Sequence, residues 1–368
     1  MPKKSKKTKE NELEGPQKPW KTGSAIELTK PTKKGLYQVY SLLDKQTCQK
    51  VGLMMEIPVF IKDPLVALEN PQLGVQEIWL RLENGMGDGP TSSRVAVVDF
   101  NADTQTLNEP VMWDEDEFWF ISPEKKEWLQ KPPSKRIKRL EVYRDFIEKA
   151  IRDPHFHQVN VWAVVQRVLE FYEAPQALGR PVPWGFDGNR LIIVPHAGYG
   201  ENAFYDHDSK SLQFYYCGDL EKPVYTCLSH DVIAHETGHA ILDGIRPMYN
   251  RLSSVQTAAF HEFIGDLTAI LLALHNRDIR EAVNKSTQGI LSESNLFAEL
   301  ARQFGKEVEG REYLRTALND YTMQSVQNSL SPHLVSQVLT GAMFDILIRI
   351  AARHLEKNAA EPPDSEEA

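Results

Sequence analysis

The stretch Val232-Ile233-Ala234-His235-Glu236-Thr237-Gly238-His239-Ala240-Ile241-Leu242 decides the fold. It reads as a helix, and on a helix His235 and His239 lie one turn apart on a single face. Two imidazole rings in this arrangement can bind one Zn²⁺ ion, and the carboxylate of Glu236 can take a proton from a zinc-bound water molecule. Because the flanking residues are apolar, the helix is predicted to run through a hydrophobic core.

A second helical stretch, Thr257 to Leu274, carries the carboxylates Glu262 and Asp266 in an otherwise apolar sequence. Zinc in a catalytic site needs a third protein ligand and an open fourth position. Glu262 can supply that ligand if the two helices pack side by side. Asp266, one turn further along the same face, can accept the free ring N–H of a zinc-binding histidine. The alternative is that both carboxylates are ordinary polar residues of a helix.

Length and composition are those of a soluble globular protein with a sizeable core. The chain has 368 residues, of which 41% are hydrophobic and 25% charged, and this length most naturally forms two domains. The net charge of −9 argues against a nucleic-acid-binding protein. No charge-free apolar run reaches the roughly 18 residues that a membrane span needs, so no membrane partner is expected.

The N-terminus and the cysteines favour a cytoplasmic protein. The first residues are basic, but no apolar segment follows them, so no secretory signal peptide is visible. Secretion by a route that needs no signal peptide stays open. The cysteines Cys48, Cys217 and Cys227 are too few and too irregular for a disulfide framework. A Cys217–Cys227 bridge is conceivable, but reduced thiols are the simpler interpretation.

Composition shifts divide the chain into five parts. Residues 1–34 form a basic tail that we expect to be disordered, and 35–125 form a β-rich N-terminal domain. Residues 126–139 are a basic, proline-containing linker, 140–357 hold the helices described above, and 358–368 form an acidic tail. Strands are expected at 36–42, 53–61, 77–82, 95–100, 118–121 and 191–195, and helices at 140–151, 159–172, 276–310 and 337–355.

A hairpin is predicted shortly before the zinc helix. Residues 202–205 and 212–216 read as strands, and the polar segment 206–210 between them reads as the turn. An exposed edge strand there could bind a peptide backbone by strand addition, with Asn202 adding a side-chain amide. The alternative is a structural hairpin in which Asn202 only serves the turn.

Five motifs in this order make the chain resemble the thermolysin-like zinc metallopeptidases of the gluzincin group. They are the zinc helix His235-Glu236-Thr237-Gly238-His239, the Glu262/Asp266 helix, the edge strand Asn202-Ala203-Phe204-Tyr205, Leu314-Arg315, and His333 followed by Ser336. The matches cover about residues 155–345. Tyr249 is the best match for the family's transition-state tyrosine, although a one-residue gap is needed.

The resemblance implies a role for each matched residue. His235, His239 and Glu262 would bind one Zn²⁺ per chain, with Asp266 behind them, and Glu236 would act as the base toward zinc-activated water. His333 and Tyr249 would stabilise the oxyanion. Asn202, Ala203 and Arg315 would hold the peptide backbone of the substrate. The implied fold is α+β and zincin-like, with a β-rich N-terminal part, a mainly helical C-terminal part and the zinc helix between them.

Two departures from the family pattern change what is expected. The family orients its oxyanion histidine with an aspartate, but Asn328 stands at that position, and an amide cannot stabilise an imidazolium. Asp231 matches one carboxylate of the family's double calcium site, but Ala273 stands where a bridging carboxylate would be. We therefore expect zinc and no calcium.

The sequence thus predicts a zinc-dependent endopeptidase whose partner is a peptide or protein substrate. One alternative is a cytoplasmic regulatory protease that cleaves a single protein partner. The other belongs to a different class, a catalytically silent, zinc-stabilised protein that uses the cleft to hold a peptide. The presence of Glu236 speaks against the silent protein, because such a protein has no need of a base beside the metal.

Overall fold

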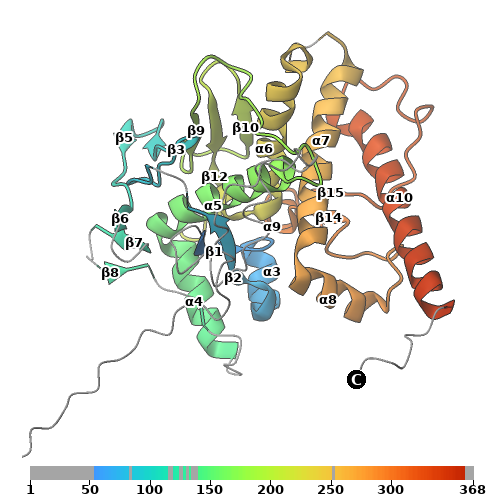
Figure 1. The fold of residues 1–368 in the computed structure, drawn as a ribbon, viewed down its shortest axis with the longest axis horizontal. Helices are drawn as coiled ribbons and strands as arrows, with labels where there is room; N and C mark the ends of the chain where they lie inside the picture. Colours follow the sequence, from blue (N-terminus) through green and yellow to red (C-terminus); the bar gives the residue numbers. More distant parts are fainter. Residues whose placement is uncertain are drawn as a thin grey trace, which may run out of the picture.

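The structure, a computed structural model, describes residues 54–82, 85–114, 119–123, 127–129, 132–133, 140–250 and 253–360. The expectations for the basic tail 1–34, the strand 36–42, Cys48 and residues 361–368 lie outside these ranges. Within them the chain is a mixed α+β protein with eight α-helices and several small sheets. The helices gather in the C-terminal part, which confirms the α+β class (Figure 1).

The N-terminal part contains a short helix that the strand pattern did not predict. Strands β1 (Met54–Phe60) and β2 (Val75–Arg81) pair in antiparallel fashion, as expected from their alternating apolar residues. Between them lie α3 (Pro64–Glu69) and the 3₁₀ helix η1 (Pro71–Leu73). The Asp63 side chain accepts the Val66 N–H, and Pro64 begins the helix. A helix this short has no readable periodicity, so its cap and proline were its only signals.

A four-stranded sheet joins distant parts of the sequence. Its strand order is β10 (Ala203–Asp206), β11 (Ser211–Phe214), β9 (Leu191–Val194) and β3 (Val95–Val97). The predicted hairpin is therefore present, and β10 lies at an open edge of the sheet. Strand β3 pairs in parallel with β9 and brings the expected N-terminal domain into the sheet beside the cleft.

The remaining strands are short and pair locally. Residues Glu127–Trp128 pair with β7, so part of the segment expected as a linker belongs to a sheet. Figure 1 shows β5 to β8 on the side of the molecule opposite the C-terminal helix α10 (Pro332–Ala360). The pairs are β4 (Phe100–Asn101) with β5 (Thr106–Leu107), β7 (Trp119–Ser122) with both β6 (Met112–Asp114) and β8 (Glu127–Trp128), β12 (Tyr216–Cys217) with β13 (Val224–Tyr225), and β14 (Glu299–Leu300) with β15 (Arg315–Thr316).

The helix α5 is buried along most of its length and packs against α4, α6 and, to a smaller extent, α7. The 3₁₀ helix η2 (Thr226–Leu228) leads into α6, η3 (Pro247–Asn250) lies between α6 and α7, and α7 packs between α6 and α10. The helices are α4 (Leu140–Arg152), α5 (Pro154–Glu173), α6 (His230–Ile245), α7 (Val255–His275), α8 (Arg277–Thr287), α9 (Arg302–Glu307) and α10 (Pro332–Ala360).

Two helical expectations were wrong in their extent. The stretch 276–310 is not one helix, because Gln288 and Gly289 both have positive φ and end α8. At the C-terminus, α10 begins at Pro332, which suits a first helical turn, and continues to Ala360. Residues 358–360, assigned to the acidic tail, therefore belong to a helix, and His333 lies in its first turn.

Two glycines let α6 and α7 cross closely. A Cβ atom on Gly238 would lie 3.2 Å from the Cα of Gly265 and 2.8 Å from the Thr268 hydroxyl. A Cβ atom on Gly265 would lie 2.6 Å from the ring of His235. Because neither position has room for a side chain, the two helices approach at the level of the zinc motif. This close approach is what brings the carboxylates of α7 to the histidines of α6.

Two helices are long and apolar enough to cross a membrane by length and composition alone, over Val255–His275 and Pro332–His354. The helices of a soluble core can give the same signal. The apolar window of α7 is 56% buried inside the structure and that of α10 is 33% buried. The absence of a membrane span stays a prediction from sequence.

Candidate metal centre and cleft

Every residue that the sequence singled out for the site lines one cavity of about 670 Å³. The cavity lies between the zinc helix α6, the helix α7, the edge strand β10 and the start of α10. Tertiary packing has brought together residues from position 202 to position 333. They are Asn202, Ala203, His235, Glu236, His239, Tyr249, Glu262, Asp266, Arg315 and His333.

The three expected zinc ligands converge on one point. Nε2 of His235 lies 3.3 Å from Oε2 of Glu262, and Nε2 of His239 lies 3.7 Å from Oε1 of the same carboxylate. Their ligand atoms all lie within 4.8 Å of one another. Two imidazole nitrogens and a carboxylate oxygen around a common centre are a donor set that suits Zn²⁺.

The groups behind the ligands fix the orientation of His235. Oδ1 of Asp266 lies 3.1 Å from Nδ1 of His235, which leaves Nε2 of the ring on the side of Glu262 and His239. Gln337 and Thr340 of α10 lie 3.4 Å from Oδ2 of Asp266. Nδ1 of His239 is buried and has no hydrogen-bond partner among the described residues. Asp266, which was expected behind the metal, is therefore held in place by α10.

Burial and the neighbouring charges set the protonation of the site. Burial lowers the pKa of His239 to about 3, which keeps its ring neutral. Burial also acts against charge on His235, but hydrogen bonds with Asp266 and Glu262 raise the pKa of His235 to about 10. Despite burial, hydrogen bonds with His235 and His333 lower the pKa of Glu262. Glu262 is thus an anion, which suits a cation ligand.

The side chain of Glu236 faces the edge strand β10. Its Oε2 accepts the backbone N–H of Tyr205 at 3.1 Å. Burial raises the pKa of Glu236 to about 7, which places the group in the range useful for proton transfer near neutral pH. The helix therefore presents a carboxylate beside the metal ligands and next to the strand expected to hold a peptide.

The edge strand β10 forms one wall of the cleft. Its inner side pairs with β11, while its outer side carries no strand in the described part of the chain. Oδ1 of Asn202 accepts the Ala203 N–H at 2.9 Å, so in this state its carbonyl caps the start of the strand. Its amide nitrogen remains the group that would reach a peptide.

Arg315 and His333 enter the cleft from β15 and α10 and contact the ligand carboxylate. Nδ1 of His333 lies 2.7 Å from Oε2 of Glu262, and a guanidinium nitrogen of Arg315 lies 3.3 Å from the same oxygen. Arg315 also lies 3.2 Å from Nδ1 of His333. The groups that position His333 are therefore Arg315 and Glu262. A side chain 64% exposed to solvent can still turn toward a bound substrate.

Tyr249 lies at the rim of the cleft on η3. Its ring packs edge-on against Phe260, with the ring centroids 6.0 Å apart, and its side chain is partly exposed. The residue lines the same cavity as the expected zinc ligands, but its ring is held by η3 and α7.

Two residues that the sequence analysis did not single out, His207 and Asp243, help to tie the edge strand to the zinc helix. Oδ2 of the buried Asp243, one turn after His239, accepts the Tyr205 hydroxyl at 2.6 Å and lies 2.7 Å from Nδ1 of His207. These contacts hold the hairpin against α6 and so set the width of the cleft. A signal was available, because Asp243 is a carboxylate four residues after His239 and therefore on the same face of the zinc helix.

Asp231, the residue matched to a calcium carboxylate, is paired with a buried lysine. Nζ of Lys62 lies 2.6 Å from Oδ2 of Asp231 and donates to the carbonyls of Leu296 and Glu299 at 2.9 and 3.1 Å. The Ala301 N–H also donates to Oδ2 of Asp231, at 3.1 Å. An ammonium group thus supplies the positive charge that a metal ion would bring to this carboxylate.

We therefore expect neither stability nor activity to depend on calcium. A calcium ion needs about six to eight oxygen ligands, several from carboxylates, and Asp231 is already neutralised by Lys62. The measurement is a melting curve with and without a calcium-selective chelator, with zinc kept saturating. A fall in Tm of more than a few degrees would show that calcium is bound by other residues.

Comparison with known proteins leaves the family open. No model of a known protein family matches the chain, and no curated protein matches it either. The function is therefore inferred from the residues and their geometry.

Proposed function

We propose that the protein is a zinc-dependent endopeptidase. The observation that carries the proposal is the convergence of His235, His239 and Glu262, whose ligand atoms lie within 4.8 Å of one another. The carboxylate of Glu236 lies beside this group and contacts the open edge strand β10. A bare metal site would need only the three ligands. The added base and the peptide-sized cleft favour hydrolysis of a peptide bond.

The chemistry divides between the metal and the side chains. A Zn²⁺ ion held by these three residues supplies a Lewis acid that polarises a carbonyl and acidifies water. The carboxylate of Glu236 takes the proton released from the attacking water and then passes it to the leaving amine. Because Oε2 already accepts the Tyr205 N–H, Oε1 is the oxygen that carries this proton.

The remaining residues bind and orient the substrate. A peptide that adds to the open edge of β10 would run past Glu236, with the Asn202 amide bonding its backbone. Arg315, His333 and Tyr249 are further hydrogen-bond donors that line the cleft. Donors in that position stabilise negative charge on the carbonyl oxygen as it forms.

Removal of a ligand tests the metal site. The His239→Ala variant is expected to lose the zinc ion of the cleft and all hydrolysis of a peptide library, because two ligands bind zinc far more weakly than three. His275→Ala, at the end of the neighbouring helix α7 and outside the cleft, is the control and should retain both. Elemental analysis and mass spectrometry of the digest give the readouts. Full zinc occupancy in His239→Ala would place the metal elsewhere and end this proposal.

A further inference from the structure

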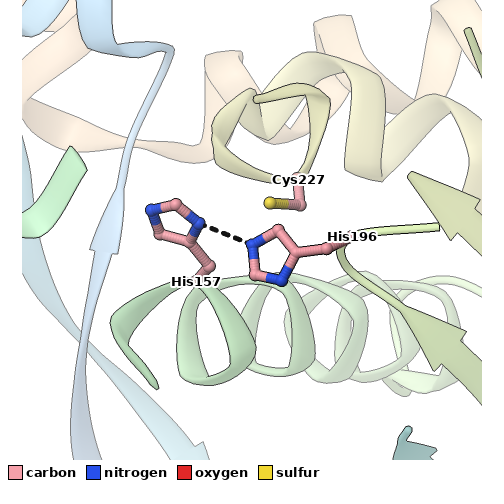
Figure 2. A group of neighbouring side chains, drawn as sticks. All are labelled: His157, His196 and Cys227. Carbon is pink, nitrogen blue, oxygen red and sulfur yellow. Dashed lines mark hydrogen bonds between the residues drawn. The ribbon is translucent and has the colours of Figure 1, made fainter. Parts of the chain in front are cut away.

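A second group of metal-binding side chains lies outside the cleft, where α5, the end of β9 and η2 meet. It consists of His157, His196 and Cys227, and its ligand atoms lie within 4.8 Å of one another (Figure 2). All three side chains are excluded from solvent, with exposed fractions of 1%, 6% and 0%. The ring of Tyr225 packs against both imidazoles, at centroid distances of 4.6 and 5.7 Å.

The outer ring nitrogens of the two histidines are held by acceptors. Nε2 of His157 lies 2.9 Å from the Ile151 carbonyl, and Nδ1 of His196 lies 2.9 Å from both oxygens of Asp99. Neither a carbonyl nor a carboxylate can donate, so both ring nitrogens carry a proton. Asp99 also accepts the amides of Gln158 and Asn108, at 2.8 and 3.0 Å, which supports its ionised form.

These protons leave the inner nitrogens of two neutral rings facing each other. Nδ1 of His157 and Nε2 of His196 lie 2.8 Å apart, and in neutral rings each would present a lone pair. Two lone pairs at that distance repel, so a positive charge must lie between them. Either an extra proton or a metal ion can provide it.

The position of Cys227 favours a metal ion over an extra proton. Figure 2 shows its sulfur atom directed toward the contact between the two rings. A shared proton would involve the two nitrogens alone, whereas a metal ion would use all three donors. Histidines that bind metals characteristically donate their other ring N–H to a carboxylate or a backbone carbonyl, which is the arrangement at both His157 and His196.

We propose that His157, His196 and Cys227 bind a second Zn²⁺ ion, buried and separate from the cleft. The donor set of two imidazoles and one thiolate suits a zinc ion. Its two positive charges would balance the Cys227 thiolate and the Asp99 carboxylate, so the buried group would be neutral as a whole. The expected metal content becomes two ions per chain, rather than the single ion expected from the sequence.

The movement required of the two ring nitrogens is small. With zinc–nitrogen bonds of about 2.0 Å in a tetrahedral site, two ligand nitrogens lie about 3.3 Å apart, so the present separation of 2.8 Å needs to open by about 0.5 Å. Small rotations of the two rings are enough. The ion would link α5 and β9 to η2, which leads directly into the zinc helix α6. Its role would be to brace the start of that helix.

Cobalt substitution tests the second site. The full chain, freed of metal and reloaded with Co²⁺, is expected to bind about two ions, one of them with a sulfur-to-cobalt charge-transfer band in the near ultraviolet. The cleft site has only nitrogen and oxygen donors and cannot give that band. His239→Ala should therefore lose one cobalt ion and keep the band, which separates failure at the cleft from failure here.

Cysteine variants assign the sulfur. Cys227→Ser is expected to lose the band and one cobalt ion, and to lower the Tm of the zinc form by several degrees. Cys217→Ser, the other buried free cysteine, and Cys48→Ser are matched controls and should keep the band. If Cys227→Ser does not fold, X-ray absorption at the zinc edge of the unmodified protein replaces it, and one sulfur neighbour is expected. A chain with one metal ion and no sulfur ligand would show that the histidines share a proton only, and would overturn the proposal.

Discussion

Replacing Glu236 by glutamine is expected to lower kcat for peptide hydrolysis by about 10²–10⁴-fold, the range typical of a lost general base. The amide has the shape of the carboxylate but cannot take a proton from water. Its carbonyl oxygen can still accept the Tyr205 N–H, the 3.1 Å contact that holds the side chain. Fold and zinc content should therefore be unchanged, because Glu236 is not one of the converging ligands.

The measurement is a steady-state assay on purified variant with zinc content determined on the same sample. Glu201→Gln is the matched control, because Glu201 also lines the cleft but lies outside the ligand group. It should leave kcat nearly unchanged. Full activity in Glu236→Gln would indicate a contaminating protease or another base. Bound zinc without hydrolysis in the unmodified protein, across a broad peptide library, would favour the silent peptide-binding protein.

Replacing Lys62 by methionine is expected to lower the free energy of unfolding by about 3–5 kcal/mol, the range for breaking a buried ion pair by removing one partner. Lys62 and Asp231 have exposed fractions of 0% and 3%, and their charged atoms lie 2.6 Å apart. Methionine fills a similar volume but leaves the Asp231 carboxylate without a counter-charge. The carbonyls of Leu296 and Glu299 would also lose their donor.

Urea denaturation at saturating zinc gives the readout, since bound metal itself shifts the equilibrium. Adding Asp231→Asn to Lys62→Met should recover much of the loss, because the buried charge disappears and an amide oxygen can still accept the Ala301 N–H. Arg277→Met, which breaks an exposed pair with Glu281, is the control and should change stability little. A loss below about 1 kcal/mol for Lys62→Met would show that Asp231 has another counter-charge.

The sequence by itself determined the local features of this protein. The spacing of His235 and His239, and of Glu262 and Asp266, places each pair on one helix face, because a helix turn fixes that geometry whatever surrounds it. The hairpin of β10 and β11 followed from its turn residues in the same way. The structure also has no bridge between Cys217 and Cys227, which agrees with the simpler interpretation of these cysteines.

Only the tertiary structure decided which of these features meet. Glu262 reaches the histidines because Gly238 and Gly265 let two helices cross closely, and nothing in the periodicity of either helix specifies that crossing. Residues far apart in sequence also form the Lys62–Asp231 ion pair and the group of His157, His196 and Cys227. Such contacts depend on how whole helices and strands pack, so no local sequence pattern predicts them. The sequence places the candidate ligands on their helices, and tertiary packing decides which of them meet.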